Sequence, residues 1–191
     1  MMSEKFNKKT DEELAVMAEG NIAVFEELIS RYEKKLMRYI ARIANFSNEE
    51  NEEVLQEIFI KVWKNINSFS SDLKFSSWIY RIAHNETISI YRKAKSRGIS
   101  DQVELNDELF LPSKIDFVKE LDDKISSHNI QNVLLEMDTK SREILVLKFL
   151  EEQSYEEISD ILKLPMGTIA TRINRAKEKF RGILNKLKIK F

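Results

Sequence analysis

The chain has 191 residues, 42% of them hydrophobic, with only 4 Gly, 2 Pro and no Cys. This is enough for one large or two small packed domains, and the scarcity of Gly and Pro predicts helices rather than strands and tight turns. The sequence excludes a disulfide framework and thiolate chemistry, and it shows no signal peptide and no apolar run near the roughly 18 residues that cross a bilayer. We therefore expect a cytoplasmic, all-helical protein without direct membrane insertion.

Charge is distributed unevenly although the net charge is only −1. Residues 163–191 carry nine Lys or Arg against one acid, and residues 78–98 carry five against one. Residues 49–57 carry five Glu and no basic residue. Two basic blocks and one acidic block indicate more than one kind of partner, and the basic blocks suit nucleic acid.

The first half of the chain shows helical periodicity in two stretches. Apolar residues recur at spacings of three and four over 11–45, where we expect Asp11 to cap a short first helix and Gly20-Asn21 to separate it from the second. A second apolar stripe predicts a helix over 51–66. Trp63 on this helix is interpreted as a core residue, because Trp is on average highly buried.

A third amphipathic helix is predicted from Ser76 to about Lys95, after the polar turn 67–72. Trp78 is interpreted as a core residue of this helix. Residues 98–116 lack clear periodicity, are rich in Asp and Glu and contain a proline, so they predict a flexible linker. Helical periodicity returns over 117–137, with a break expected at 126–129.

The clearest pattern is a helix-turn-helix near the C-terminus. Ser154 and Glu157 have the spacing of a capping box, which predicts the start of a short helix that ends at Lys163. The turn 164–167 follows, and a longer helix is predicted over 168–187. On this last helix the apolar residues follow helical spacing on one side, and the opposite side carries Thr168, Thr171, Arg172, Arg175 and Lys179.

A basic face of this kind suits a helix that enters the major groove of DNA. Arg172 and Arg175 can each donate two hydrogen bonds to a guanine, and Thr171 can contact a phosphate or a thymine methyl group. Lys179 is placed for phosphates, which add affinity without sequence information. The alternative is a solvated basic face on a terminal helix, but the capping box, the turn and the charge asymmetry together favour DNA binding.

Four segments resemble bacterial sigma factors of the extracytoplasmic-function (ECF) type. Residues 141–149 (SREILVLKF) and 167–177 (GTIATRINRAK) resemble their −35-recognising domain, region 4. Residues 53–63 (EVLQEIFIKVW) resemble the polymerase-binding helix of region 2, and residues 75–85 (FSSWIYRIAHN) its −10-recognising helix. The resemblance implies two small helical domains, region 2 over 11–97 and region 4 over 117–187, joined by the acidic linker 98–116.

The resemblance also implies partners and site residues. Core RNA polymerase would be contacted at its β′ coiled coil and β flap, with Glu53, Gln56, Glu57 and Lys61 as the binding residues on region 2. Recognition and opening of the −10 element would involve a loop and the helix after it, through Phe69, Ser71, Asp72, Lys74, Arg81, His84, Asn85, Arg92 and Lys93. Members of the family are commonly held inactive by an anti-sigma factor, which the sequence does not identify, and a stress signal is implied by analogy alone.

Two positions depart from the family pattern. Ser89 stands where an Asp is common, which puts a carboxylate contact there in doubt. Lys177 stands where an Arg is common, so a bidentate contact there would become a point charge.

The sequence predicts no enzyme. It contains no P-loop, HExxH or dinucleotide fingerprint, and its two His residues are far apart, so we expect no catalytic site, metal, cofactor or small-molecule substrate. The predicted function is a sigma factor that directs core polymerase to promoters. Rivals are a helix-turn-helix regulator that is not a polymerase subunit, a helical adaptor that contacts only proteins, and a small helical hydrolase.

Overall fold

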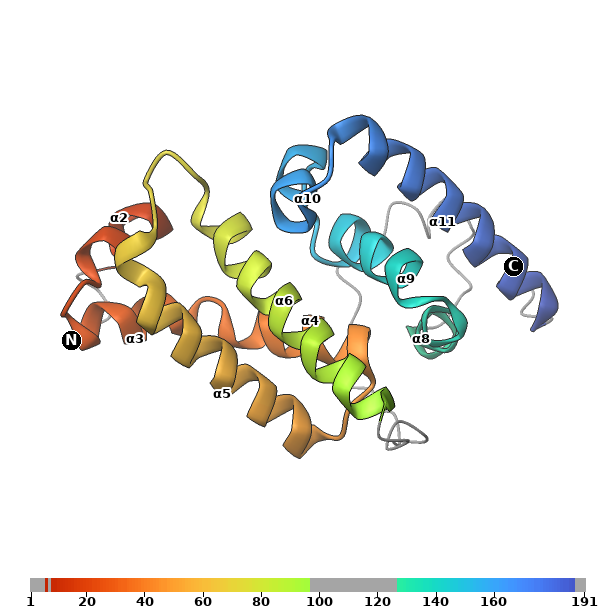
Figure 1. The fold of residues 1–191 in the computed structure, drawn as a ribbon, viewed down its shortest axis with the longest axis horizontal. Coiled ribbons are helices and arrows are strands. Elements are labelled where there is room, and N and C mark those ends of the chain that lie inside the picture. Colours follow the sequence, from red (N-terminus) through yellow and green to blue (C-terminus); the bar gives the residue numbers. More distant parts are fainter. Residues whose placement is uncertain (1–5, 7, 97–126, 188–191) are drawn as a thin grey trace.

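In the computed structural model, residues 6, 8–96 and 127–187 are described, and their regular elements are all helical (Figure 1). The N-terminal part contains α2 (Asp11–Met17), α3 (Ile22–Ser30), α4 (Glu33–Ala44), α5 (Asn48–Asn65), the short 3₁₀ turn η1 (Ile66–Ser68) and α6 (Phe75–Ser96). The C-terminal part contains α8 (Ser127–Glu136), α9 (Thr139–Leu145), the π-helical turn η3 (Val146–Leu150), α10 (Tyr155–Leu162) and α11 (Met166–Lys186).

The first helix begins one residue earlier than its sequence suggested. Thr10, not Asp11, is the N-cap of α2, and its hydroxyl accepts from the Glu13 amide while the Glu13 carboxylate accepts from the Thr10 amide. The prediction for Asp11 was therefore wrong. Its carboxylate instead accepts hydrogen bonds from Arg31 (2.8 Å) and the Tyr32 hydroxyl (2.5 Å), which ties α2 to the start of α4.

The break between the first two helices is confirmed at Gly20-Asn21. Gly20 has a φ of 67°, a left-handed conformation that costs glycine little because it has no Cβ. Asn21 then caps α3, accepting through its side chain from the Val24 amide. The sequence therefore contained both the residue that turns the chain and the residue that starts the next helix.

The two long helices of the N-terminal part match their predicted ranges, with α5 beginning three residues earlier because Ser47 and Glu50 form a capping box. Trp78 on α6 is buried, as predicted, and packs edge-on against Phe69. Trp63 is 38% exposed, so its interpretation as core was wrong. Near the end of α5 its ring meets the Phe25 ring (centroids 4.8 Å apart) but is not enclosed.

The helix-turn-helix is present in the C-terminal part. The Ser154–Glu157 capping box is confirmed, with the Ser154 hydroxyl accepting from the Glu157 amide at 3.1 Å and the Glu157 carboxylate accepting from the Ser154 amide at 2.7 Å. Lys163, in a left-handed conformation, ends α10, and α11 begins after Pro165. The break expected at 126–129 is contradicted from Ser127 onward, because α8 runs continuously through Asn129. The rest of the predicted stretch 117–126 and the linker 98–116 lie outside the described residues.

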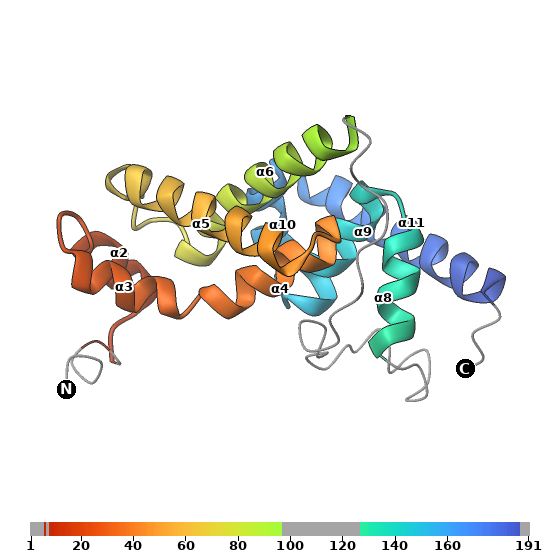
Figure 2. The same ribbon diagram turned by 90° about the horizontal axis from the view of Figure 1, so that it is seen from below.

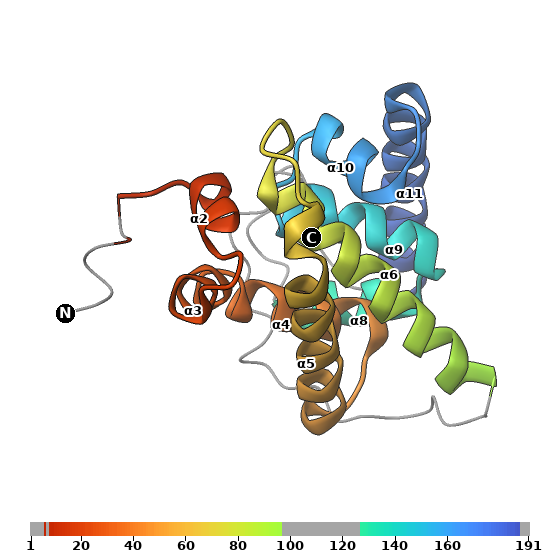
Figure 3. The same cartoon turned by 60° about the vertical axis from the view of Figure 1, so that its left-hand side comes forward.

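The two parts pack against each other through α6. This helix lies against α4 and α5 on one side and against α10 on the other (Figures 1 and 3). α11 packs on α9 and α10, and α8 contacts α4. Seen from below, α2 and α3 lie at one end of the molecule, and α8 and the end of α11 lie at the other (Figure 2). Buried apolar residues of both parts form one continuous core, so the C-terminal part is docked rather than merely tethered.

Candidate nucleic-acid and polymerase interfaces

The two faces predicted for α11 are present. Ile169, Ile173, Ala176 and Phe180 are buried against the rest of the C-terminal part. Thr171, Arg175 and Lys179 are exposed, while Thr168 and Arg172 are partly buried. The Thr171 hydroxyl donates to the Gly167 carbonyl in its own helix, which leaves the oxygen lone pairs facing outward as acceptors.

Lys179 has a partner inside the protein. Its ammonium group lies 2.7 Å from an Asp138 carboxylate oxygen and also donates to the Ser141 hydroxyl. Burial would raise the pKa of Asp138, but hydrogen bonds from Lys179 and Ser141 outweigh this effect and hold the pKa at about 2. Both side chains are about half exposed, so this ion pair is weak and exchangeable. The predicted phosphate contact of Lys179 would have to replace it.

The residues predicted for the −10 element lie along α6 and the loop before it. Ser71, Asp72 and Lys74 of the loop are exposed, as are Asn85, Arg92 and Lys93 on the helix, whereas Arg81 and His84 are partly buried. Phe69 is the one apolar residue of this set, and it is partly buried. Its ring packs edge-on against Phe75 and Trp78, at centroid distances of 5.4 and 5.6 Å, and it therefore belongs to an aromatic cluster under the loop.

Two of these residues contact the C-terminal part. The Lys74 ammonium lies 2.9 Å from a Glu157 carboxylate oxygen, and this hydrogen bond raises the pKa of Lys74. Burial acts to raise the pKa of Glu157, but hydrogen bonds from the Ser154 amide and from Lys74 outweigh it, so the pKa of Glu157 is lowered. His84 pairs through Nδ1 with the Glu143 carboxylate. α6 and the loop before it therefore meet the C-terminal part with side chains that the sequence predicted to face DNA.

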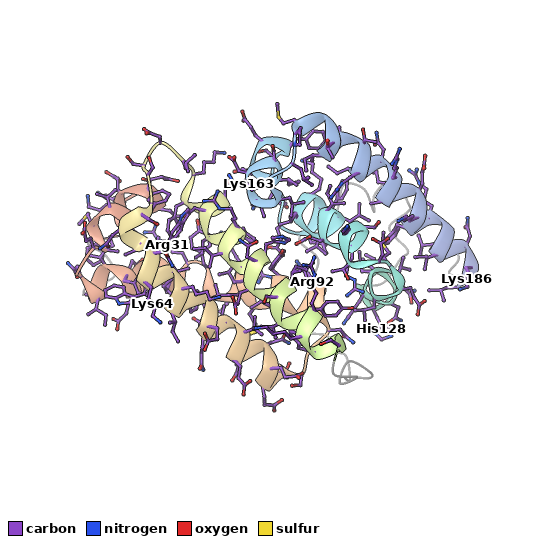
Figure 4. All side chains as sticks on the ribbon, in the orientation of Figure 1. Arg31, Lys64, Arg92, His128, Lys163 and Lys186 are labelled. Carbon is purple, nitrogen blue, oxygen red and sulfur yellow. The ribbon has the colours of Figure 1, made fainter. Side chains whose placement is uncertain are left out.

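A cavity of about 490 Å³ between α6, α9 and α11 brings the two predicted DNA surfaces together. His84 and Arg92 line it from α6, and Arg172 lines it from α11. Figure 4 labels Arg92 on the C-terminal half of α6. Residues predicted to touch DNA elements far apart on a promoter thus line one pocket that is open to solvent.

The residues predicted to bind polymerase share an exposed face of α5. Glu53, Gln56 and Glu57 are exposed and line a groove of about 320 Å³ whose floor includes Phe46 and Ile90. This combination of carboxylates, an amide and an apolar floor suits a basic amphipathic helix from a partner. Lys61, one turn further along, is exposed and pairs with Glu86 of α6.

The Sigma-70 region 2 family model matches residues 28–97, and the Sigma-70, region 4 family model matches residues 127–180. The curated "ECF RNA polymerase sigma factor SigW" of Bacillus subtilis is 37% identical over 174 residues, which span 88% of this chain and 92% of that protein. The chain belongs to the ECF sigma factors of the sigma-70 family.

Further relatives agree with this membership. The ECF RNA polymerase sigma-E factor of Escherichia coli K12 is 30% identical over 171 residues, covering 83% of this sigma factor and 85% of its own chain. The solved structure of CnrH in complex with the cytosolic domain of CnrY is 25% identical, with a TM-score of 0.68 over 92% of this chain and 97% of that one. RpoE of Bartonella quintana, in complex with the anti-sigma factor NepR, shares the fold at 21% identity, with a TM-score of 0.64 over 84% and 96% of the two chains.

Sequence reasoning missed a polar network between region 2 and region 4 of this sigma factor. Arg42 of α4 donates to Glu151 at 2.7 Å, and the Tyr80 hydroxyl of α6 donates to the other oxygen of the same carboxylate at 2.6 Å. The Tyr39 hydroxyl donates to Glu143 at 2.9 Å. Burial raises the pKa of Glu151 although Arg42 opposes this effect, and burial likewise raises the pKa of both tyrosines.

Arg142 adds a second kind of contact between the regions. It donates to the Ile43 carbonyl at the end of α4 (2.6 Å) and to the Leu135 and Met137 carbonyls at the end of α8. These are helix-terminal carbonyls, which have no partner within their own helices. The one sequence signal for this interface is Arg42, a charged residue within the otherwise uncharged and fully buried run of residues 39–44.

The described residues show no group of three or more His, Cys, Asp or Glu side chains that could hold a metal ion. No helix in the described ranges is long and apolar enough to cross a membrane.

Proposed function

We propose that this sigma factor is a dissociable initiation subunit that binds core RNA polymerase and directs it to promoters. Region 2, over 11–97, would bind polymerase and recognise and open the −10 element, and region 4, over 117–187, would read the −35 element, with 98–116 as the tether. The observation that carries the proposal is the two-faced α11 in a segment that matches region 4. Its exposed face offers Thr171 and Arg175 at the turns that would enter a major groove.

The polymerase contact is assigned to α5. Glu53, Gln56 and Glu57 lie on one exposed face above an apolar groove, an arrangement that fits a basic coiled-coil surface such as β′. Region 4 would contact the β flap. The protein would remain in the cytoplasm and associate with the nucleoid through polymerase.

Regulation by an anti-sigma factor is part of the proposal. NepR is named as an anti-sigma factor in the RpoE structure, and CnrH is bound to the cytosolic domain of CnrY. Both bound chains share the two-region architecture of this one. We therefore assign to this sigma factor a protein partner that binds it when transcription is not required.

Run-off transcription with purified core polymerase and genomic promoter fragments tests the proposal. Specific transcripts should appear only when the sigma factor is added. Glu57→Lys should abolish core binding, because it places a positive charge against a basic partner, whereas Glu19→Lys, an equal charge change in the exposed turn before α3, should not.

The two classes of function give different results. A chain that shifts promoter DNA but neither binds core polymerase nor supports transcription would be a separate helix-turn-helix regulator, and the proposal would fail. A chain that binds polymerase but loses no promoter affinity with rising salt would fail as a DNA reader, because phosphate contacts make binding salt-dependent.

A further inference from the structure

Three consecutive acidic residues open α2, and each has a different partner. Asp11 accepts hydrogen bonds from side chains that lie between α3 and α4, and Glu13 completes the capping box of its own helix. The Glu12 carboxylate instead reaches another helix. It accepts a hydrogen bond of 2.9 Å from the backbone amide of Phe75, the first residue of α6. A side chain of α2 therefore caps the start of α6.

The residue before α6 cannot cap this helix with its own side chain. The first amides of a helix have no partner within it, and the side chain just before the helix commonly accepts from one of them. Lys74 stands there, and its carbonyl accepts from the Trp78 amide, but its ammonium group has only donors and pairs with Glu157. Glu12 supplies the acceptor, and its negative charge suits the positive end of the helix dipole.

The capped amide lies at the exit of the loop that is proposed to meet the −10 element, residues 69–74. The Phe75 side chain is fully buried, and the Phe69 ring at the entrance of the loop packs edge-on against it, with centroids 5.4 Å apart. Between these ends the Leu73 amide donates to the Ser70 carbonyl, and the side chains of residues 70–74 are exposed. The placement of the exposed side chains therefore depends on how the two ends of the loop are held.

We propose that Glu12 is a positioning residue for the −10 loop, residues 69–74, and acts without contacting DNA itself. This inference rests on the proposed function. By holding the Phe75 amide, Glu12 fixes the first turn of α6 relative to α2, and with it the exit of the loop. A loop that is ordered beforehand binds a DNA strand without paying the entropy of ordering on contact. Loss of the cap should therefore weaken binding to the −10 strand and leave the polymerase and −35 contacts of α5 and α11 unchanged.

Three substitutions of Glu12 separate the reach of the side chain from its charge. Glu12→Ala removes the acceptor. Glu12→Gln keeps the length and a carbonyl oxygen that can accept from the amide but removes the charge, whereas Glu12→Asp keeps the charge on a side chain shorter by one methylene group. If the hydrogen bond positions the loop, Glu12→Gln should stay close to the wild type. Glu12→Asp should resemble Glu12→Ala and is the milder variant if Glu12→Ala fails to fold.

Glu13→Ala is the matched control. The Glu13 carboxylate also accepts from one backbone amide, that of Thr10 at 2.8 Å, but this amide belongs to the start of α2 and not to α6. Glu12→Ala and Glu13→Ala should therefore lower the stability of the protein to a similar extent in denaturant titration. A difference between the two variants in binding the −10 strand then reports on the position of the loop rather than on stability.

The first measurement is hydrogen exchange of the Phe75 amide in the free protein, followed by NMR with isotopically labelled phenylalanine. Glu12→Ala and Glu12→Asp should accelerate this exchange by about 2- to 10-fold, the factor that corresponds to one hydrogen bond. Glu12→Gln and Glu13→Ala should leave it unchanged. The Phe69 amide, which donates to the Ile66 carbonyl, is the internal reference and should not respond to any of the four substitutions. Unchanged exchange of the Phe75 amide in Glu12→Ala would overturn the inference.

The second measurement is binding of the reconstituted holoenzyme to a single-stranded oligonucleotide that carries the −10 sequence found by run-off transcription. Glu12→Ala and Glu12→Asp should weaken binding by about 2- to 30-fold, the factor that loss of one helix cap gives. Glu12→Gln and Glu13→Ala should bind like the wild type, and all four variants should bind core polymerase normally.

Equal losses of −10 binding in Glu12→Ala and Glu13→Ala would show a role in stability alone and would overturn the inference. Wild-type binding by Glu12→Ala would overturn it as well. A wild-type holoenzyme that neither binds the −10 strand nor produces transcripts would instead refute the proposed function, and the positioning role would fall with it. The two failures are distinguishable because the first leaves the wild-type protein active.

Discussion

Arg175→Ala should reduce discrimination among −35 sequences rather than overall affinity. The side chain is exposed on the outward face of α11, so its removal leaves the core of region 4 intact. A bidentate Arg–guanine contact provides about 1–3 kcal/mol of discrimination. This corresponds to a preference of about 5- to 150-fold at one base pair, which the variant should lose. Arg172→Ala should behave in the same way at a neighbouring position.

Lys179→Ala is the matched comparison on the same helix. Its loss should weaken binding to all sequences about equally and reduce the slope of log affinity against log salt by about 1, as expected for one phosphate contact. The ion pair with Asp138 is half exposed and contributes about 1 kcal/mol or less, so it should not keep Lys179 from DNA. The wild-type protein can therefore exchange Asp138 for a phosphate at small cost.

The assay is promoter binding by the reconstituted holoenzyme on a set of −35 variants, each measured at several salt concentrations. Using the holoenzyme ensures that region 4 is in its DNA-binding arrangement. If Arg175→Ala lowers binding to every sequence by the same factor, then Arg175 contacts phosphate and the assignment of reading residues on α11 is wrong. A loss of discrimination among −35 sequences in Lys179→Ala would also contradict this assignment, because it would make Lys179 a base-reading residue.

Four further predictions concern stability. Ser154→Ala removes the side-chain cap of α10 and should lower the free energy of unfolding by about 1 kcal/mol in denaturant titration. Gly20→Ala should cost about 1–2 kcal/mol through its positive φ alone, because nothing lies within 4 Å of an added Cβ. Ile58→Ala should cost about 2–5 kcal/mol because Ile58 is fully buried, whereas Ile60→Ala, at a side chain that is 45% exposed, should change stability by less than about 0.5 kcal/mol. The pKa of Asp138 is about 2 in the folded protein, below its ordinary value of 3.8, so ionised Asp138 should stabilise the fold fully above pH 3.8. This stabilisation should be lost as the pH falls from 3.8 to about 2, and Asp138→Asn should flatten the dependence of the unfolding free energy on pH in this range.

The parts of the fold that could be predicted are those encoded within a few residues. Ser154 and Glu157 cap the same turn, and Gly20 and Asn21 are adjacent, so sequence alone located these boundaries. The error at Asp11 was an error of one residue, because Thr10 is an equally good N-cap and forms a capping box with Glu13. Trp63 was wrongly predicted to be a core residue because helical periodicity shows which face of a helix is apolar. It does not show whether a neighbouring helix extends far enough to cover that face near the end of α5.

The polar network between region 2 and region 4 could not be predicted because its partners are far apart in the chain. Tyr39 and Glu143 are separated by 104 residues, and Arg42 and Glu151 by 109. A single sequence gives no sign that a Glu after α9 neutralises an Arg within α4. The family resemblance identified the segment that contains Arg142 and Glu143 but could not assign either residue a contact with region 2.

The polar contacts between region 2 and region 4, which accompany the apolar core that the two regions share, involve residues that are proposed to meet the −10 element. To hold DNA, α6 must carry polar and cationic side chains in addition to the apolar residues that it contributes to the shared core. A partner that covers it in the free protein must supply acceptors, and Glu143, Glu151 and Glu157 do so from region 4. These carboxylates occupy the side of region 2 that polynucleotide phosphates would otherwise approach. The Lys74 and His84 side chains that contact these carboxylates are also among those proposed to meet the −10 element, so the two contacts draw on the same groups.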